Sequence, residues 1–200
     1  MLIGAPLGST CTVIRARART GREATDRATQ HRARLRARYP GPEAEPSVRR
    51  WRERFDPSAR AGVPAHITVL FPFLAESRID ALVHSALADV LGSRPAFDLR
   101  FERCGRLPGV LCLVPDPDTQ LRQLTEAIAD RWPEAPPYGG RFAEIVPHLT
   151  IAQGQEDAVL EKAEADLAGR LPFTSHVSSV ELIVYDGTKW QERASFTLGE

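Results

Sequence analysis

The chain has 200 residues, of which 42% are hydrophobic and 26% are charged, and its formal net charge is zero. These values are close to those of globular domains, so we expect a folded protein rather than a disordered or fibrous one. No run approaches the ~18 apolar residues of a membrane helix, and no hydrophobic signal-peptide core is visible, which predicts a cytoplasmic protein without membrane contact.

Positive charge is concentrated at the beginning of the chain. Residues 1–40 contain nine arginines against Glu23 and Asp26. A basic segment ahead of a mildly acidic body does not predict a protein that binds nucleic acid across a broad face. We expect residues 1–32 to be a disordered arm in front of a single domain over residues 33–200. Composition alone also allows a mitochondrial transit peptide or a start codon placed too early.

The first half of the domain contains the signals of alternating strands and helices. Residues 33–39 alternate Arg with Ala and Leu and are the candidate for a first strand, with residues 10–14 as the alternative. A helix is predicted from about Glu43 to Phe55, followed by a loop. The β-branched and aromatic run that begins at Pro64 predicts the next strand.

A second helix and a pair of strands complete this half. Ser77 is the predicted N-cap of the helix, with Asp80 three residues later, and Gly92 ends it. Residues 97–104 and 110–114 are predicted as two strands joined by a turn. The second half repeats the order helix, strand, helix, strand, strand, at residues 117–132 (capped by Asp116-Pro117), 146–152, 159–167, 180–185 and 190–198.

This repeat of elements predicts the fold class. We expect an α+β protein of two pseudo-symmetric αβαββ lobes, which together form one bilobal domain. In this fold, antiparallel sheets flank a central cleft and helices cover the outer faces. A pseudo-two-fold axis would place corresponding strands of the two halves on opposite sides of the cleft.

The same three-residue pattern, His-x-Thr, occurs once in each half, as His66-Ile67-Thr68 (the first motif) and His148-Leu149-Thr150 (the second motif). Residues i and i+2 of a strand project from the same face, about 7 Å apart, so each motif points an imidazole and a hydroxyl the same way. Corresponding positions in two lobes would bring the motifs together. The repeat therefore predicts one site that contains both histidines and both threonines.

Two histidines suit the acid/base chemistry of a phosphodiester. At neutral pH one imidazole, if neutral, takes a proton from a nucleophile, while the other, if protonated, gives a proton to the leaving oxygen. In-line substitution places the base and the acid on opposite sides of phosphorus. The threonine hydroxyls would donate hydrogen bonds to the non-bridging oxygens. The near-symmetry leaves open which histidine is the base.

The two histidines allow two other interpretations. A zinc site needs a third ligand, and Glu144 is the only acidic residue close to either motif, so we expect no metal. The histidines could also be hydrogen-bonded residues of half-buried strands without a catalytic role. A third pattern of this kind, His176-Val177-Ser178, lacks the preceding proline and has no counterpart in the first half. We interpret it as polarity of the surface or of an edge strand.

With their flanking residues, the two motifs resemble those of the two-histidine phosphoesterase superfamily, which includes the bacterial 2′-5′ RNA ligase-like proteins and the cyclic nucleotide phosphodiesterases. Residues 62–73 look like its first motif and residues 146–152 like its second, and the resemblance covers about residues 40–200. It implies that His66 and His148 are the acid/base pair and that Thr68 and Thr150 bind phosphate. The first strand of the family is apolar, whereas here it is rich in arginine.

The resemblance implies a metal-independent enzyme that hydrolyses 2′,3′-cyclic phosphates, or related cyclic phosphodiesters, on RNA ends or nucleotides. Ligation of RNA through a 2′-5′ bond is the same chemistry in reverse. We expect a monomer that uses no cofactor and whose partner is an RNA terminus or a cyclic nucleotide. The alternative is a non-catalytic module that binds a nucleotide or an RNA end in the same cleft.

Several other side chains lie near the motifs in the sequence. Tyr138 and Arg141 belong to the loop before the second motif and could reach a base or a phosphate, although anchoring of the loop is the favoured interpretation. Phe71, which follows the first motif, and Trp190, in the last predicted strand, are expected to pack in the core.

Overall fold

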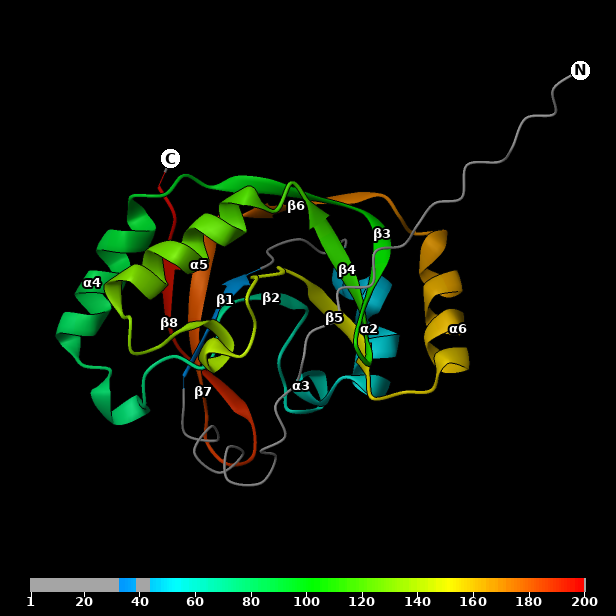
Figure 1. The fold of residues 1–200 in the computed structure, drawn as a ribbon, viewed down its shortest axis with the longest axis horizontal. Coiled ribbons are helices and arrows are strands. Elements are labelled where there is room, and N and C mark those ends of the chain that lie inside the picture. The colour runs from blue at the N-terminus through cyan, green and yellow to red at the C-terminus, as the bar shows by residue number, and fades with distance from the viewer. Residues whose placement is uncertain (1–32, 39–43, 200) are drawn as a thin grey trace, which may run out of the picture.

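Two four-stranded antiparallel sheets and the helices around them form an α+β fold, as the sequence predicts (Figure 1). The computed structural model describes residues 33–38 and 44–199. The expected arm at residues 1–32 and the alternative first strand at residues 10–14 lie outside the described residues.

The first sheet has the strand order β2-β1-β7-β8. Its strands are β1 (Arg34–Arg38), β2 (His66–Leu70), β7 (Ser179–Tyr185) and β8 (Trp190–Thr197). β1 lies between β2 and β7, and Arg36 is opposite Thr68 on one side and Glu181 on the other. The arginine-rich candidate is therefore confirmed as the first strand, because two neighbouring strands provide partners for its backbone groups.

The second sheet has the order β5-β4-β3-β6. Its strands are β3 (Phe97–Leu107), β4 (Val110–Asp116), β5 (Leu149–Gln153) and β6 (Phe173–Val177). The first five residues of β3 are alternately buried and exposed, which is the pattern of a strand with one face on the core. The hairpin between β3 and β4 turns at Gly109, whose φ of +71° suits glycine. β6 was not predicted and forms an edge of this sheet.

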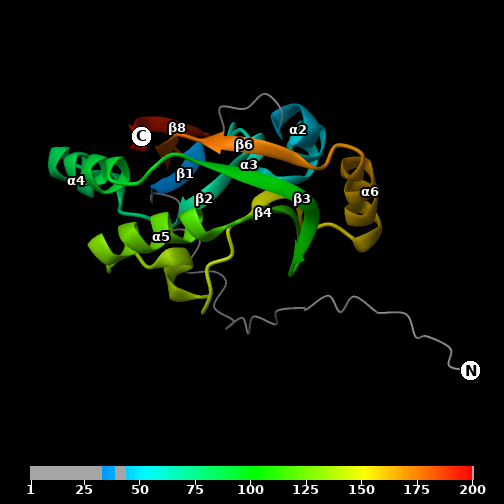
Figure 2. The ribbon, with the colours of Figure 1, turned by 90° about the horizontal axis from the view of Figure 1, so that it is seen from above.

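The helices pack at the two ends of the molecule. They are α2 (Ala44–Phe55), α3 (Pro57–Arg60), α4 (Ala81–Gly92), α5 (Thr119–Arg131) and α6 (Asp157–Ala168), with short 3-10 helices at Glu76–Arg78 and Pro137–Gly140. α4 and α5 lie together at one end, and α2 and α6 at the other (Figures 1 and 2). α5 packs against β2 in the first sheet, whereas α2 packs against β5 in the second.

The sheets do not follow the two halves of the sequence. The hairpin of β3 and β4 belongs to the first half but pairs with β5, which carries the second motif. The hairpin of β7 and β8 belongs to the second half but pairs with β1, next to the first motif. The prediction that each αβαββ half forms its own lobe is therefore wrong, because the hairpins are exchanged between the sheets.

One hydrophobic core joins the two sheets. It includes Ile67 and Leu182 from the first sheet and Leu113 and Ile151 from the second, all fully buried. The core is continuous because β2 and β5, which belong to different sheets, contact one another. The two motif-bearing strands therefore pack side by side within one folded unit.

Three local predictions are corrected by the structure. Asp80, not Ser77, is the N-cap of α4, since its carboxylate accepts a hydrogen bond from the backbone N–H of Val83 at 2.9 Å. Asp118, not Asp116-Pro117, directly precedes α5, and β4 extends through Asp116. The predicted loop after α2 contains the short helix α3.

Candidate active site

The two motifs occupy matching places on β2 and β5. His66 is the first residue of β2, and His148 immediately precedes β5. Thr68 and Thr150 follow within the strands, and both are half-buried. Because β2 and β5 contact one another, residues that are 82 positions apart in the sequence lie on neighbouring strands.

The two imidazoles share one hydrogen-bonding arrangement. Nδ1 of His66 lies 2.9 Å from the carbonyl oxygen of Pro64, and Nδ1 of His148 lies 2.7 Å from that of Val146. A carbonyl oxygen can only accept, so Nδ1 carries the hydrogen in each ring. In a neutral imidazole of this tautomer, Nε2 presents a lone pair. Each ring is thus held by the carbonyl two residues before it, with Nε2 as the nitrogen that can exchange a proton with a ligand.

The two rings differ in their surroundings. His66 is buried, with 8% of its surface exposed, whereas His148 is half-buried. Burial lowers the pKa of His148 below its ordinary value, and the hydrogen bond to Val146 opposes this in part. The neutral form of His148 is therefore favoured at neutral pH.

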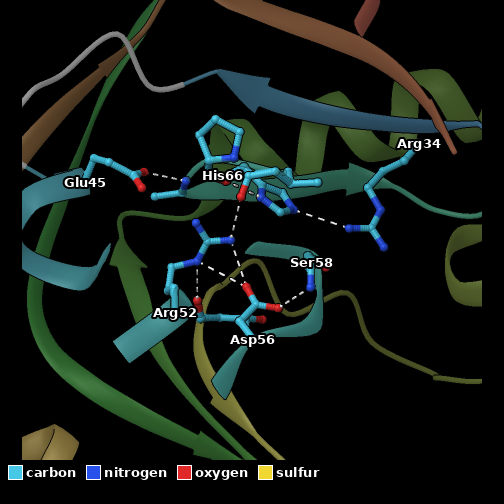
Figure 3. Close-up of polar contacts among 10 residues, drawn as sticks. Arg34, Glu45, Arg52, Asp56, Ser58 and His66 are labelled. Carbon is cyan, nitrogen blue, oxygen red and sulfur yellow. Dashed lines mark hydrogen bonds and ion pairs between the residues drawn. The ribbon is translucent and has the colours of Figure 1, made fainter. Parts of the chain in front are cut away.

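An arginine that sequence reasoning did not select lies beside His66. Nη1 of Arg34, the first residue of β1, is 3.4 Å from Nε2 of His66 (Figure 3). The Arg34 guanidinium also lies 4.4 Å from the ring centroid of Phe71 and 4.6 Å from that of Trp190. Phe71 and Trp190 are half-buried, so the prediction that they belong to the core is wrong: both rings contact a cation next to the first motif.

The loop before the second motif is anchored to the end of β2. The backbone N–H of Tyr138 donates to the carbonyl of Phe71 at 2.7 Å, which confirms the anchoring interpretation. Tyr138 adopts a φ of 53°, and its ring meets that of Phe142 edge-on at 5.5 Å. Burial raises the pKa of Tyr138, and the charge of Arg34 opposes this. The Tyr138 phenol is therefore close enough to the Arg34 guanidinium for the two groups to interact electrostatically. Arg141, in the same loop, is exposed.

A buried ion pair links the segments that carry the two motifs. Arg52 and Asp56, one turn apart at the end of α2, are 2.8 Å apart and almost fully buried (Figure 3). Nε of Arg52 donates to the carbonyl of Thr150 at 3.1 Å, and Nη2 donates to that of Val63 at 3.3 Å. Arg52 thus connects the backbone of the second motif to the approach of the first.

A glutamate from the same helix supports the first motif. The backbone N–H of Ala65, which directly precedes His66, donates to the carboxylate of Glu45 at 2.6 Å (Figure 3). Charged acceptors make strong hydrogen bonds. Two residues of α2 therefore fix the backbone that leads into His66: Glu45 binds the N–H of Ala65, and Arg52 binds the carbonyl of Val63.

The third His-containing pattern is separate from this arrangement. His176 lies on the edge strand β6 and is exposed, and its Nδ1 is 2.7 Å from the carboxylate of Asp98. The interpretation as edge-strand polarity is confirmed. His176 thus provides a histidine of the same chain outside the candidate site.

Within residues 33–38 and 44–199, no cluster of three or more His, Cys, Asp or Glu side chains is arranged to hold a metal ion. Glu144 is exposed. Among the helices described, none has the length and apolar character needed to cross a membrane.

The chain is similar to known proteins in sequence and in fold. The family model of the 2′-5′ RNA ligase superfamily matches residues 40–189. The structure of E. coli LigT complexed with 3′-AMP superposes with a TM-score of 0.54 at 19% identity, covering 85% of this chain and 99% of that one. TT0787 of Thermus thermophilus superposes with a TM-score of 0.57 at 17% identity, covering 84% and 99%. These structures share the fold. No curated protein sequence gives a significant match.

Proposed function

The chain belongs to the 2′-5′ RNA ligase superfamily, and we propose that it is a metal-independent phosphodiesterase that hydrolyses 2′,3′-cyclic phosphates on RNA ends or nucleotides. His66 and His148 act as the general acid/base pair, and Thr68 and Thr150 bind the phosphate. Membership of this family supports a phosphoesterase or RNA ligase-like activity, and the substrate and the residue roles are our proposal.

The observation that carries the proposal is the shared arrangement of the two histidines. Each ring is oriented by a backbone carbonyl at Nδ1, so proton transfer would take place through Nε2 in both. Two structural histidines would not need matching orientations on contacting strands. Proton transfer by a positioned imidazole is the general acid/base role that a phosphodiester requires.

The reaction follows from these two groups. One neutral imidazole takes a proton from water as the oxygen attacks phosphorus. The bond from phosphorus to the ribose O2′ or O3′ breaks, and the other imidazole, in its protonated form, gives its proton to that oxygen. The product is a phosphomonoester, and the two imidazoles have exchanged protonation states. With the 5′-hydroxyl of a second RNA end in place of water, the same steps break the bond from phosphorus to O3′ and join the two ends through a 2′-5′ bond.

The nucleotide class is supported by a relative. LigT of E. coli has been crystallised with 3′-AMP, with ATP and with NADP+, all of which contain a phosphorylated adenosine. A shared fold does not select the substrate. We therefore propose the 2′,3′-cyclic phosphate group as the recognised chemistry and leave the base unassigned.

A metal-free assay tests this function. The purified chain is incubated with each of the four 2′,3′-cyclic nucleotides, and with an oligoribonucleotide that ends in a cyclic phosphate, in the presence of EDTA. We expect turnover in the wild type and a loss of about 10²- to 10⁴-fold in rate for His66→Ala and for His148→Ala.

His176→Ala is the matched control and is expected to retain the wild-type rate, because His176 is exposed on β6. Wild-type rates in His66→Ala or His148→Ala would contradict the proposal. Binding of the nucleotides without any product would instead favour a non-catalytic binding module.

A further inference from the structure

Arg34 lies at the nitrogen through which the first histidine would act. Its Nη1 is 3.4 Å from Nε2 of His66, while Nδ1 of the same ring is occupied by the carbonyl of Pro64. A substrate that exchanges a proton with Nε2 must therefore come within reach of the Arg34 guanidinium. Figure 3 shows the side chain directed from β1 toward the imidazole.

Two aromatic rings fix the position of this guanidinium. Its central carbon is 4.4 Å from the centroid of the Phe71 ring and 4.6 Å from that of Trp190. The two rings meet edge-on, with centroids 6.0 Å apart and planes at 74°. Aromatic faces attract a cation. Phe71 and Trp190 thus hold the Arg34 guanidinium in place beside the His66 imidazole.

The strands that hold this group come from distant parts of the chain. Arg34 begins β1, Phe71 directly follows β2, and Trp190 begins β8. The backbone of Tyr138 in turn donates to the carbonyl of Phe71. Since three strands and one loop converge on Arg34, its guanidinium is fixed by the fold rather than by a local turn.

We propose that Arg34 is a substrate-binding residue, which donates hydrogen bonds to a non-bridging oxygen of the phosphate held between the two motifs. This inference rests on the proposed function, because it assigns a further ligand to the same phosphate. Arg has five N–H donors in a planar fork that matches phosphate oxygens, so it can bind an oxygen while it stays between the rings. As negative charge develops on the oxygens in the transition state, a fixed cation beside them stabilises it.

The test compares Arg34→Gln and Arg34→Lys with the wild type. For each protein, kcat and KM are measured on a 2′,3′-cyclic nucleotide, and the Kd of adenosine 3′-monophosphate is measured by titration calorimetry. We expect Arg34→Gln to lower kcat/KM by about 10- to 100-fold and to weaken binding of the monophosphate, because a charge-assisted hydrogen bond is lost. Arg34→Lys keeps the charge but not the fork and should recover part of both.

Arg100→Gln is the matched control, because Arg100 lies on β3 in an exposed pair with Glu102. It is expected to leave kcat/KM and Kd unchanged. Thermal unfolding of every variant separates a binding role from a structural one. A melting temperature for Arg34→Gln within a few degrees of the wild type, together with weaker monophosphate binding, supports the proposal.

Three results would overturn the proposal. The first is a Kd of Arg34→Gln equal to that of the wild type. The second is a kcat/KM of Arg34→Gln equal to or above that of the wild type. The third is a loss of kcat/KM in Arg34→Lys as large as in Arg34→Gln, together with unfolding of both variants. If the wild type binds adenosine 3′-monophosphate but has no turnover, the proposed function fails. The Kd values of the two Arg34 variants then still decide whether Arg34 binds phosphate.

Discussion

Arg52 is 1% exposed, yet it carries a charge and contacts both halves of the candidate site. Its partner is Asp56, and its other hydrogen bonds go to the carbonyls of Thr150 and Val63. A buried ion pair gains little over apolar packing, but removing one partner leaves an uncompensated charge in the core. The role of Arg52 is therefore to hold the backbone at Thr150 and the backbone at Val63 in fixed positions relative to one another.

Breaking this pair should destabilise the fold. We expect Arg52→Met to lower the free energy of unfolding by about 3–5 kcal/mol, because the Asp56 carboxylate stays buried without its cation. The double variant Arg52→Met/Asp56→Leu should lose less, since no charge is left behind. Urea unfolding at equilibrium measures both. Arg49→Met, in an exposed pair with Glu53 on the same helix, is the control and should unfold at the wild-type midpoint. Equal losses in the single and the double variant would argue against this account.

The sequence predicts part of the candidate site. His66, Thr68, His148 and Thr150 could be selected because the same pattern occurs twice in matching contexts. Arg34 and Arg52 could not, because they reach the motifs from 32 and 98 positions away along the chain. No local pattern distinguishes them from the other arginines of an arginine-rich chain.

At the level of elements, the start of α4 shows how two capping signals compete. Ser77 and Asp80 are both residues that favour an N-cap. The chain forms a 3-10 helix at Glu76–Arg78, which contains Ser77, and α4 begins only after Asp80. The sequence predicts that a helix begins in this segment. The 3-10 helix before α4 determines that Asp80, and not Ser77, accepts a hydrogen bond from the first turn of α4.

A pair of substitutions checks this assignment. Asp80→Ala should lower the free energy of unfolding by about 1 kcal/mol, because the N–H of Val83 loses its acceptor. Ser77→Ala should have a much smaller effect. Denaturant unfolding of the two variants side by side gives the comparison. If Ser77→Ala proved the more destabilising, the cap would lie at Ser77.

For the molecule as a whole, the continuous core predicts cooperative unfolding. Leu113 in the second sheet and Leu182 in the first are both fully buried in the same hydrophobic cluster. We expect Leu113→Ala and Leu182→Ala each to cost about 2–5 kcal/mol and to move a single transition. Circular dichroism and tryptophan fluorescence should give coincident curves.

Leu82→Ala is the control for these variants. Leu82 is 79% exposed on α4, so its truncation should leave the transition nearly unchanged. Two separated transitions in either core variant would show that the sheets unfold independently.

The arrangement of the sheets could not be predicted from the sequence, although most elements could. The hairpin of β3 and β4 turns at Gly109, and that of β7 and β8 turns at Asp186-Gly187. Both are local features, and turn residues identify them. Which sheet each hairpin joins depends on pairing between distant strands. The repeat suggested that each half would form its own lobe. Instead, each hairpin pairs in the sheet that carries the motif of the other half, and both sheets contribute to one core.

The pairing of β1 with β7 has a consequence for the ribosome-bound chain. Arg34 lies opposite Ile183, so the centre of the first sheet joins one of the earliest described residues to one of the last. Chains are synthesised from the N-terminus at about 5–20 residues per second. β1 and β2 therefore emerge many seconds before the strand that completes their sheet, whereas β3, β4 and β5 can already pair. We expect the nascent chain to pair β3, β4 and β5 first and to place Trp190 against Arg34 only after β7 and β8 have been synthesised.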